Sequence, residues 1–212
     1  MPDAGLTPAA NDRGRRGTGT AERPAGHFAA PRTDTRSRVQ KVALELFAEQ
    51  GYEKTSLREI AERLGVTKAA LYYHFPSKEA IVHSFTDDYF AEIDALLDWA
   101  KVQPLTEATR REILRRYVGI VLGGSEVFRF LHQNQASVQA MEAGKDRFAR
   151  FRGRLDALVD MLAVPDAPLR DRVRATAAVL SVGATYMFYL PQVDDPDQLG
   201  AIILELATEL IR

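Results

Sequence analysis

The stretch TSLREIAERLGVTKAALYYHFPSKEA, residues 55–80, decides the fold. Ser56 and Glu59 have the form of a capping box, in which the serine hydroxyl accepts from an amide of the first turn and the glutamate accepts from the cap amide. Apolar residues then recur at helical spacing up to Gly65, a residue type that commonly ends helices. The first half of the stretch therefore predicts a short amphipathic helix.

A second short helix is predicted directly after it. Thr67 is a favourable N-cap, so we expect a helix over residues 68–75 that begins after a turn of three residues. Two helices joined in this way form a helix-turn-helix, which places the second helix in the DNA major groove and the first across the backbone. Leu71 and Phe75, four residues apart, face inward, and the small Ala69 lets the helix approach base edges.

The stretch also resembles a known family. Together with ALELFAEQG, residues 43–51, it closely resembles the DNA-binding domain of TetR-family repressors. Ala69, where many relatives have glycine, is a mild substitution. The positions that carry the pattern are Gly51, Thr55, Ile60, Ala61, Gly65, Val66, Leu71, Tyr73, Phe75 and Lys78. The resemblance implies an Ω-shaped homodimer with a three-helix DNA-binding domain and a larger helical domain that binds an inducer and forms the dimer interface.

The resemblance also implies DNA-contacting residues. The expected phosphate contacts are Thr55, Thr67, Tyr73, His74 and Lys78. The expected base or groove-floor contacts are Lys68, Ala69 and Tyr72. Two alternatives stay open: Tyr72 is half-buried against the first helix, or His74 only caps a neighbouring carbonyl. Charge agrees with DNA contact, because residues 35–85 hold eight Lys or Arg against six Asp or Glu, whereas residues 86–212 hold fifteen against nineteen.

The whole pattern predicts an all-α protein. An N-terminal three-helix helix-turn-helix domain, residues 35–85, precedes a C-terminal helical ligand-binding and dimerisation domain, residues 86–212. The first helix begins at Thr35 and stops at Gly51. The later helices, separated by proline and glycine, are predicted over residues 77–100, 106–122, 125–143, 145–162, 168–190 and 196–211.

Residues 1–34 are rich in Gly, Pro, Ala, Thr and Arg and lack helical or strand periodicity, so we predict a disordered tail. Five arginines against four acidic residues favour a solvated segment without a function. The cluster Arg13, Arg15 and Arg16 leaves a second interpretation open, namely contact with the DNA minor groove.

The last two predicted helices carry broad apolar stripes. The stripe residues are Val173, Ala177, Leu180, Ala184 and Met187 in one helix and Leu199, Ile202, Ile203, Leu206, Leu210 and Ile211 in the other. Such stripes are compatible with a core, but together with the resemblance they predict a four-helix interface across a two-fold axis. A two-fold axis places two recognition helices about one DNA turn apart and thus predicts a palindromic operator.

A ligand cavity is predicted from aromatic and polar side chains that mix in the larger domain. The candidate lining residues are Phe128, His132, Gln135, Phe151 and Tyr186. A pocket with aromatic walls and a few polar groups suits a mid-sized apolar compound. The alternative is that these aromatic residues belong to an ordinary core.

Other classes of function find little support. The chain has no cysteine, so disulfides and thiolate sites are excluded, and its formal net charge of -1 shows no overall basicity. There is no Gly-rich phosphate loop, HExxH or GxSxG motif, so we expect no enzyme, no catalytic residue and no cofactor. His83 and Asp87 are four residues apart, a spacing that suits a shared metal ion. Polar pairs with this spacing usually only face water, so we expect no metal.

These patterns predict a cytoplasmic, ligand-responsive repressor. Its expected partners are double-stranded operator DNA, a small-molecule inducer and a second copy of the chain, bound through the two C-terminal helices. No uninterrupted run of eighteen apolar residues is present, and we expect no membrane. The alternatives are a transcriptional activator or a DNA-binding protein without a ligand.

Overall fold

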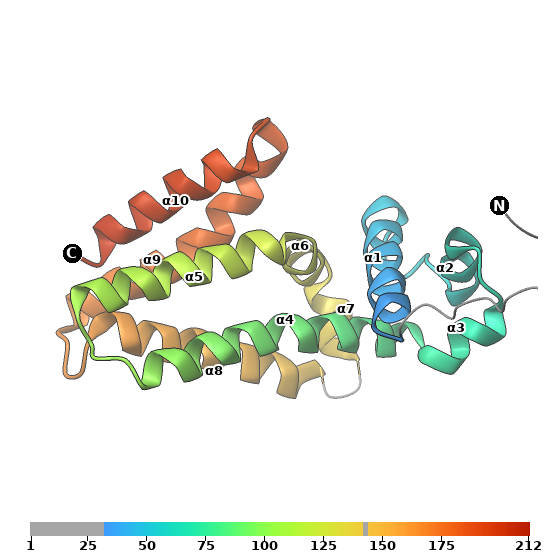
Figure 1. Ribbon diagram of the computed structural model, residues 1–212, viewed down its shortest axis with the longest axis horizontal. Helices are drawn as coiled ribbons and strands as arrows, with labels where there is room; N and C mark the ends of the chain where they lie inside the picture. The colour runs from blue at the N-terminus through green and yellow to red at the C-terminus, as the bar shows by residue number, and fades with distance from the viewer. Residues whose placement is uncertain (1–31, 142–143) are drawn as a thin grey trace, which may run out of the picture. The chain divides into compact units, whose positions relative to one another are not determined.

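The computed structural model describes residues 32–141 and 144–212. Within these ranges the regular structure is helical and no strand occurs, so the all-α prediction is confirmed (Figure 1). The elements are α1 (Arg32–Gln50), α2 (Leu57–Leu64), α3 (Lys68–His74), α4 (Lys78–Lys101), α5 (Glu107–Gly123), α6 (Ser125–Gln133), α7 (Gln135–Ala140), α8 (Gly144–Ala163), α9 (Leu169–Tyr189), the 3-10 turn η1 (Leu190–Gln192) and α10 (Pro196–Leu210).

Helix α1 begins at Arg32 instead of Thr35. The rest of the predicted tail, including Arg13, Arg15 and Arg16, lies outside the described residues.

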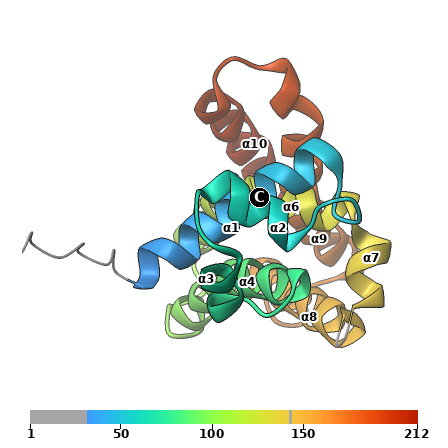
Figure 2. The same cartoon turned by 90° about the vertical axis from the view of Figure 1, so that its right-hand side faces the viewer.

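The helix-turn-helix unit, defined as α1–α3 with the first two turns of α4, has the local geometry that the sequence predicts (Figure 2). Ser56 and Glu59 form the complete capping box at the start of α2. Gly65 ends α2 with φ of 69° and ψ of 28°, in the left-handed region that glycine adopts without strain. Thr67 caps α3 and Ser77 caps α4, each through a side-chain oxygen that accepts a backbone N–H. Local signals therefore set the path of the chain through this unit.

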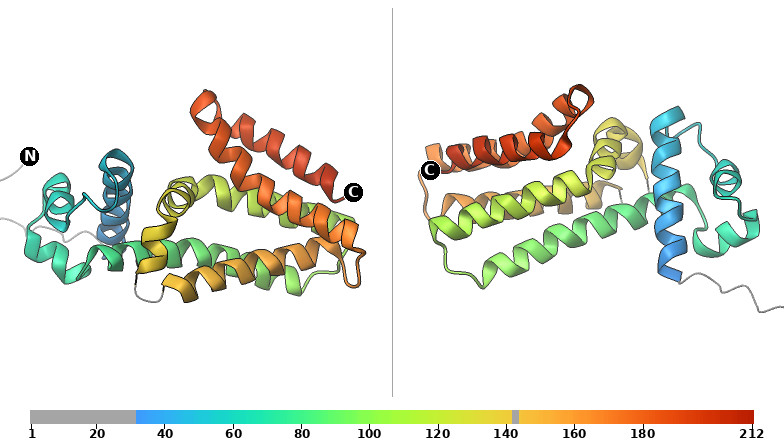
Figure 3. Two further views of the ribbon diagram at one scale, coloured as in Figure 1. Left: turned by 180° about the vertical axis from the view of Figure 1, so that it is seen from behind. Right: turned by 45° about the horizontal axis from the view of Figure 1, so that its top comes forward.

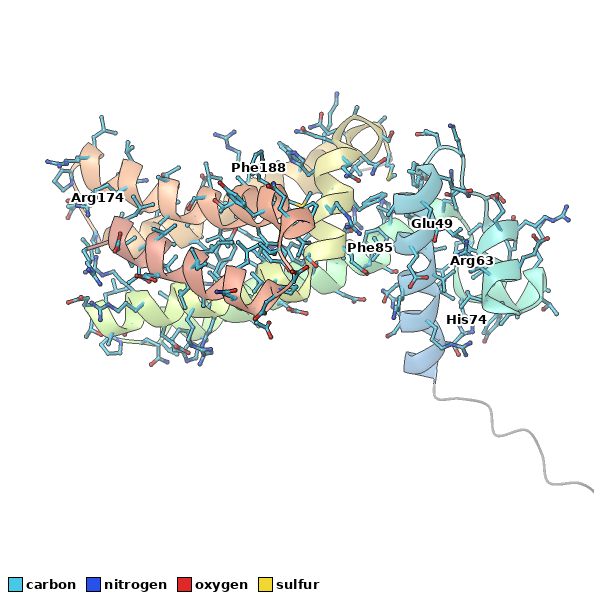
Figure 4. All side chains as sticks on the ribbon, turned by 90° about the horizontal axis from the view of Figure 1, so that it is seen from above. Glu49, Arg63, His74, Phe85, Arg174 and Phe188 are labelled. Carbon is cyan, nitrogen blue, oxygen red and sulfur yellow. The ribbon has the colours of Figure 1, made fainter. Side chains whose placement is uncertain are left out.

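One apolar core holds the unit together. Ile60 of α2, Leu71 of α3 and Phe85 of α4 are all buried within it beside α1. Phe85 also lies edge-on to Phe130 of α6, with 5.2 Å between ring centroids, and Figure 4 shows Phe85 beside α1. Because Phe130 is buried in the same core, α6 packs directly against the helix-turn-helix unit.

The remaining helices form a second core, which we call the α4–α10 bundle. Helix α4 belongs to both parts: its first turns lie in the helix-turn-helix core, and its later turns, including Ile93 and Leu97, lie in the bundle core. Helix α4 contacts α5 and α8, and α9 packs between α8 and α10 (Figures 1 and 3). At Gly183 the ring of Phe128 comes so close that a Cβ would lie 2.4 Å from it, so glycine is required for this packing of α6 against α9.

One predicted helix is wrong. Residues 125–143 do not form a single helix, because the chain leaves helical geometry at Asn134, between α6 and α7. The Asn134 side-chain amide donates to the Phe130 carbonyl at 3.0 Å, and this carbonyl also accepts from the Asn134 backbone N–H. A side chain that competes for backbone partners disfavours helix continuation. Helix α7 then ends at Ala140, and Met141 is extended.

The segment Leu169–Gln192 is long and apolar enough to pass a length-and-composition test for a membrane span. Core helices of soluble proteins pass the same test, and here the segment packs against α8, α5 and α10. Its high apolar content reflects two apolar sides, one buried in the bundle and one exposed at residues such as Leu180 and Phe188.

Candidate nucleic-acid interface and ligand cavity

The outer side of α3 is a candidate nucleic-acid interface. Leu71 points inward and is 1% exposed, whereas Tyr72 and Tyr73 are 44% and 76% exposed. Thr67 and Lys68 at the start of α3 are also exposed. Tyr72 and Tyr73 each combine a ring with a hydroxyl group, and such side chains suit a surface that meets phosphates and base edges.

The predicted residues Thr67, Lys68, Ala69, Tyr72 and Tyr73 all lie on this exposed side. The Lys68 ammonium lies 5.4 Å from the centre of the Tyr72 ring, so the two side chains form one positively charged, aromatic surface. Tyr72 is exposed, and therefore its alternative placement, half-buried against α1, is not what the structure shows.

His74 lies at the end of α3 and is partly buried, with its ring edge-on to Tyr73 at 5.4 Å. It lines a small depression together with Arg38 of α1 and Leu64 of α2. His74 is therefore at the edge of the exposed side of α3, and its phosphate contact stays a prediction.

Thr55 is placed differently from the prediction of a side-chain contact to phosphate. It is 2% exposed, and its hydroxyl donates to the Gly51 carbonyl at 2.9 Å and accepts from the Gln50 amide at 3.3 Å. The side chain is thus fully used in fixing the connection between α1 and α2. Sequence spacing does not reveal this, because the partners come together only when the connection folds.

Lys78 is also engaged within the protein. Its ammonium donates to the Tyr52 carbonyl at 2.7 Å and lies 4.2 Å from the centre of the Tyr52 ring. Burial raises the pKa of the Tyr52 hydroxyl to about 12, and Glu79 and Glu53 add to the effect. Lys78 nevertheless lines an open groove where the N-termini of α2 and α4 meet, beside Ser56 and Ser77. Amides at helix N-termini favour anions, so this groove has the chemistry of a phosphate site.

Ion pairs and caps hold the recognition geometry in place. The Arg63 guanidinium of α2 pairs with Glu49 of α1 at 2.9 Å, and both residues are labelled in Figure 4. This hydrogen bond lowers the pKa of Glu49. The hydroxyl and backbone N–H of Ser56 lower the pKa of Glu59, so the capping-box carboxylate stays charged at neutral pH.

A cavity of about 160 Å³, partly open to solvent, lies where α4, α6, α7 and α8 meet. Four of the predicted lining residues are brought together here: Phe128, His132, Gln135 and Phe151. The other lining residues are Val82, His83, Thr86, Phe90, Leu131, Val138, Gln139, Met141, Arg147 and Phe148. Mostly apolar walls with a few polar groups are typical of small-molecule sites.

The prediction that Tyr186 lines this cavity is wrong. It is 4% exposed and belongs to the bundle core, where it is buried together with Val182 of the same helix and Leu199 of α10. The aromatic character that suggested a ligand contact is here a core feature.

Asp87, which lies four residues after His83, is engaged by another helix. Its carboxylate pairs with both terminal nitrogens of Arg147 on α8, one of them at 3.3 Å. Among the described residues, no group of three or more His, Cys, Asp or Glu is arranged to hold a metal ion.

Comparison with known proteins identifies the family. Residues 40–85 match the family model for bacterial regulatory proteins of the tetR family. The match covers the later turns of α1, all of α2 and α3 and the beginning of α4, and so includes the helix that forms the exposed recognition surface.

Residues 40–85 thus form a DNA-binding domain of the TetR type.

Individual relatives extend the likeness beyond this domain. The A-factor receptor protein of Streptomyces griseus is 28% identical over 156 residues, which cover 74% of this chain and 46% of the receptor. The transcriptional activator FasR of Mycolicibacterium smegmatis is 27% identical over 179 residues, 81% of this chain and 78% of FasR. The crystal structure of the TetR-family regulator PfmR from Thermus thermophilus has a TM-score of 0.64 and 20% identity, with 81% of this chain and 97% of that chain covered. The chain spans less than half of the length of the receptor, and the likeness to PfmR, at 20% identity, shows a shared fold.

Helices α9 and α10 expose an apolar surface, which we call the α9–α10 face. Its large exposed side chains are Val173, Leu180, Phe188, Ile202 and Leu206. Figure 4 shows Phe188 near the end of α9, with Arg174 near its beginning. Val173, Ala177, Leu180 and Ala184, four of the predicted stripe residues, are exposed on one side of α9, whereas Leu199 and Ile203 of the second stripe are buried.

Sequence analysis missed several cavity residues, above all Arg147. It lies on α8, distant in sequence from the aromatic segment around residue 128, and its spacing gave no signal of a shared site. His83 and Thr86 on α4 were missed as lining residues for the same reason.

Proposed function

We propose that this TetR-family regulator is a homodimeric repressor that binds a palindromic operator and releases it when a small molecule occupies the cavity. The observation that carries the proposal is the exposed start of α3, where Thr67, Lys68, Tyr72 and Tyr73 form one polar, positively charged surface. We assign Lys68, Ala69 and Tyr72 to the groove floor and Thr67, Tyr73 and His74 to phosphates. Lys78 reaches a phosphate through the groove between the N-termini of α2 and α4.

The α9–α10 face supports the homodimer. Exposed aliphatic and aromatic side chains such as Leu180, Phe188 and Leu206 gain free energy when they leave water, and a second copy of the same surface is the partner that two-fold symmetry supplies. We propose that the two copies of α9 and α10 form a four-helix interface, which sets the distance between the two α3 helices.

Two helices connect the cavity with the helix-turn-helix unit. On α4, Val82 and Phe90 line the cavity, while the neighbouring Phe85 is buried in the helix-turn-helix core. On α6, Phe128 lines the cavity, while Phe130 enters that same core. We propose that a ligand favours a different placement of α4 and α6 and so changes the separation of the two α3 helices. An inducer releases DNA only when it binds this second arrangement more tightly.

Activation is the second candidate function. It is favoured by the extent of the likeness to FasR, whose name is that of a transcriptional activator and which aligns over 78% of its length. We further propose that the protein acts in the cytoplasm, where operator DNA is found, without a cofactor or membrane association.

The test is a gel-shift titration of the full chain against the DNA upstream of its own gene, repeated over a range of salt concentrations. We expect saturable binding to a palindrome, and we expect Lys68→Ala, a change at a groove-floor contact, to weaken this binding and to reduce the preference for the palindrome over unrelated DNA. Lys101→Ala, a matched change at the far end of α4, should leave both quantities unchanged. Binding that is equally weak for all DNA sequences, or unaffected by Lys68→Ala, would contradict the assignment. Reporter output with the gene deleted separates repression from activation.

A further inference from the structure

Arg147 gives the cavity a charged group. Among the described lining residues it is the one with a permanent charge, since the others are apolar, amide, hydroxyl or imidazole side chains. The Arg147 side chain is 17% exposed, so it is largely removed from water. A cation in such a place needs hydrogen-bond acceptors, because an unpaired buried charge is costly.

The pair that Arg147 makes leaves one of its donors unused. Its two terminal nitrogens face Asp87, whose side chain is 58% exposed to water. The Nε–H of Arg147 is buried, and no described residue accepts a hydrogen bond from it. The guanidinium thus has one edge paired with Asp87 and a buried Nε–H without an acceptor among the described residues.

A second arginine on α8 shows what a satisfied pair looks like. Arg154, two turns later, donates from Nε and Nη2 to the two oxygens of Asp94 on α4, at 2.7 and 2.6 Å. This arrangement uses the Nε edge, the same edge that Arg147 leaves open. Both pairs join an arginine of α8 to an aspartate of α4, and each partner is seven residues from its counterpart. They differ in the donor atoms, which are the two terminal nitrogens in Arg147 but Nε and Nη2 in Arg154. Arg147 is therefore poised to accept a second carboxylate along its Nε edge.

We infer that the cavity binds an apolar compound that carries a carboxylate, and that this carboxylate pairs with the Nε and Nη2 donors of Arg147 in competition with Asp87. The inference rests on the proposed ligand-binding function and names the ligand class. Arginine recognises a carboxylate through two parallel N–H donors, and such bonds are stronger than neutral ones. The apolar part of the ligand lies against Phe90, Phe128 and Phe151. When the ligand takes Arg147 from Asp87, α8 loses its ion pair to α4 near the helix-turn-helix unit.

Decanoate, decan-1-ol and decylamine form the probe set, because they share one alkyl chain and differ in charge. Binding to the full chain is measured by isothermal titration calorimetry, below the micelle-forming concentrations of decanoate and decylamine and below the solubility limit of decan-1-ol. We expect decanoate to bind about tenfold or more tightly than decan-1-ol, and decylamine to bind most weakly. Arg147→Met should remove the preference for decanoate, while Arg154→Met should keep it.

Asp87→Asn separates competition from a purely structural role. If Asp87 competes for Arg147, its neutralisation should tighten decanoate binding by about two- to fivefold, the value of one exposed ion pair. Asp94→Asn is the matched control and should have no effect on the affinity. A pair that only holds α4 to α8 predicts instead that Arg147→Met and Asp87→Asn weaken binding alike. If circular dichroism shows that Arg147→Met is unfolded, Asp87→Asn and Arg147→Lys still test the role of Arg147. Lysine keeps the positive charge but lacks the two parallel N–H donors, so Arg147→Lys should lose most of the preference for decanoate over decan-1-ol.

The outcomes separate this inference from the proposed function. Equal affinities for decanoate and decan-1-ol, both abolished by the cavity-filling Gln139→Trp, would overturn the carboxylate assignment and leave the ligand cavity standing. A preference for decanoate that survives Arg147→Met would overturn the role of Arg147. Failure of all three probes to bind would overturn both the carboxylate assignment and the ligand cavity.

Discussion

The helix-turn-helix unit and the α4–α10 bundle expose different kinds of large apolar side chains. In the helix-turn-helix unit these are Tyr72 and Tyr73, which carry hydroxyl groups and stand on α3. In the bundle most of them are aliphatic or phenyl groups, of which Leu180, Phe188 and Leu206 stand on α9 and α10. The first surface suits a hydrated, charged partner, and the second suits an apolar one. One chain thus exposes two surfaces of different chemistry.

The largest expected effect concerns the apolar surface. Leu180→Glu places a charge at the centre of the α9–α10 face, where a dimer would bury it twice. We expect the dissociation constant of the dimer to rise about thirtyfold or more, which corresponds to a hot-spot loss of about 2 kcal/mol. Sedimentation equilibrium at several concentrations measures this change.

Val102→Glu is the control for that experiment. Val102 is 78% exposed but follows α4, away from the α9–α10 face, so its replacement should leave the association unchanged. An unchanged dimer in Leu180→Glu, or a chain that is monomeric without any substitution, would show that the α9–α10 face does not form a dimer interface.

The next effect, of intermediate size, concerns the glycine that ends α2 in the helix-turn-helix unit. Gly65→Ala forces a residue with a Cβ into the left-handed region at φ 69°, and we expect the unfolding free energy to fall by about 1 kcal/mol. Gly119→Ala is the matched change in α5, where a Cβ meets nothing within 4 Å, and it should raise the unfolding free energy by about 0.8 kcal/mol. Urea denaturation measures both values. Equal signs for the two variants would show that the turn does not depend on the backbone freedom of glycine.

Features of the fold that depend on neighbouring residues could be predicted from the sequence. The caps at Ser56, Thr67 and Ser77 and the glycine at residue 65 act through neighbours within a few residues, so the helix ends around them could be predicted. The end of α6 at Asn134 could not be predicted, because apolar periodicity does not show whether the asparagine side chain will bond to the backbone or point to solvent while the helix continues.

Side-chain roles that depend on distant partners were the ones that could not be predicted. Thr55 looked available for DNA, but its hydroxyl is used by the carbonyl of Gly51 once the connection folds. Tyr186 looked like a cavity residue, but long-range packing buries it in the bundle. Arg147 enters the cavity only because α8 lies along α4, which no spacing within α8 indicates.

The smallest expected effect tests whether local encoding also operates in the bundle. Glu112 of α5 accepts hydrogen bonds from Arg115 at 2.6 and 2.7 Å and from Arg116 at 2.8 Å, and these bonds lower the pKa of Glu112 to about 2. Because this pKa lies below the ordinary value of 4.5, the stabilisation is present above pH 4.5 and is lost as the pH falls toward 2. The pairs are partly exposed, so solvent screening limits their contribution to about 0.5 kcal/mol.

Trp99, the single tryptophan, gives the measurement, since the Arg116 guanidinium lies 3.8 Å from its ring centre. Glu112→Gln should lower the unfolding free energy at pH 7 by about 0.5 kcal/mol, and the difference from the unchanged protein should shrink between pH 4.5 and 2, because the native carboxylate is then protonated as well. Urea denaturation followed by Trp99 fluorescence at each pH measures this difference, with Glu205→Gln on α10, an exposed carboxylate without an ion pair among the described residues, as the control. A difference that stays constant down to pH 2 would mean that packing of Arg116 on Trp99, and not the charge of Glu112, stabilises this part of α5. Local ion pairs would then matter less in the bundle than caps and turns do in the helix-turn-helix unit, and long-range packing would account for the bundle alone.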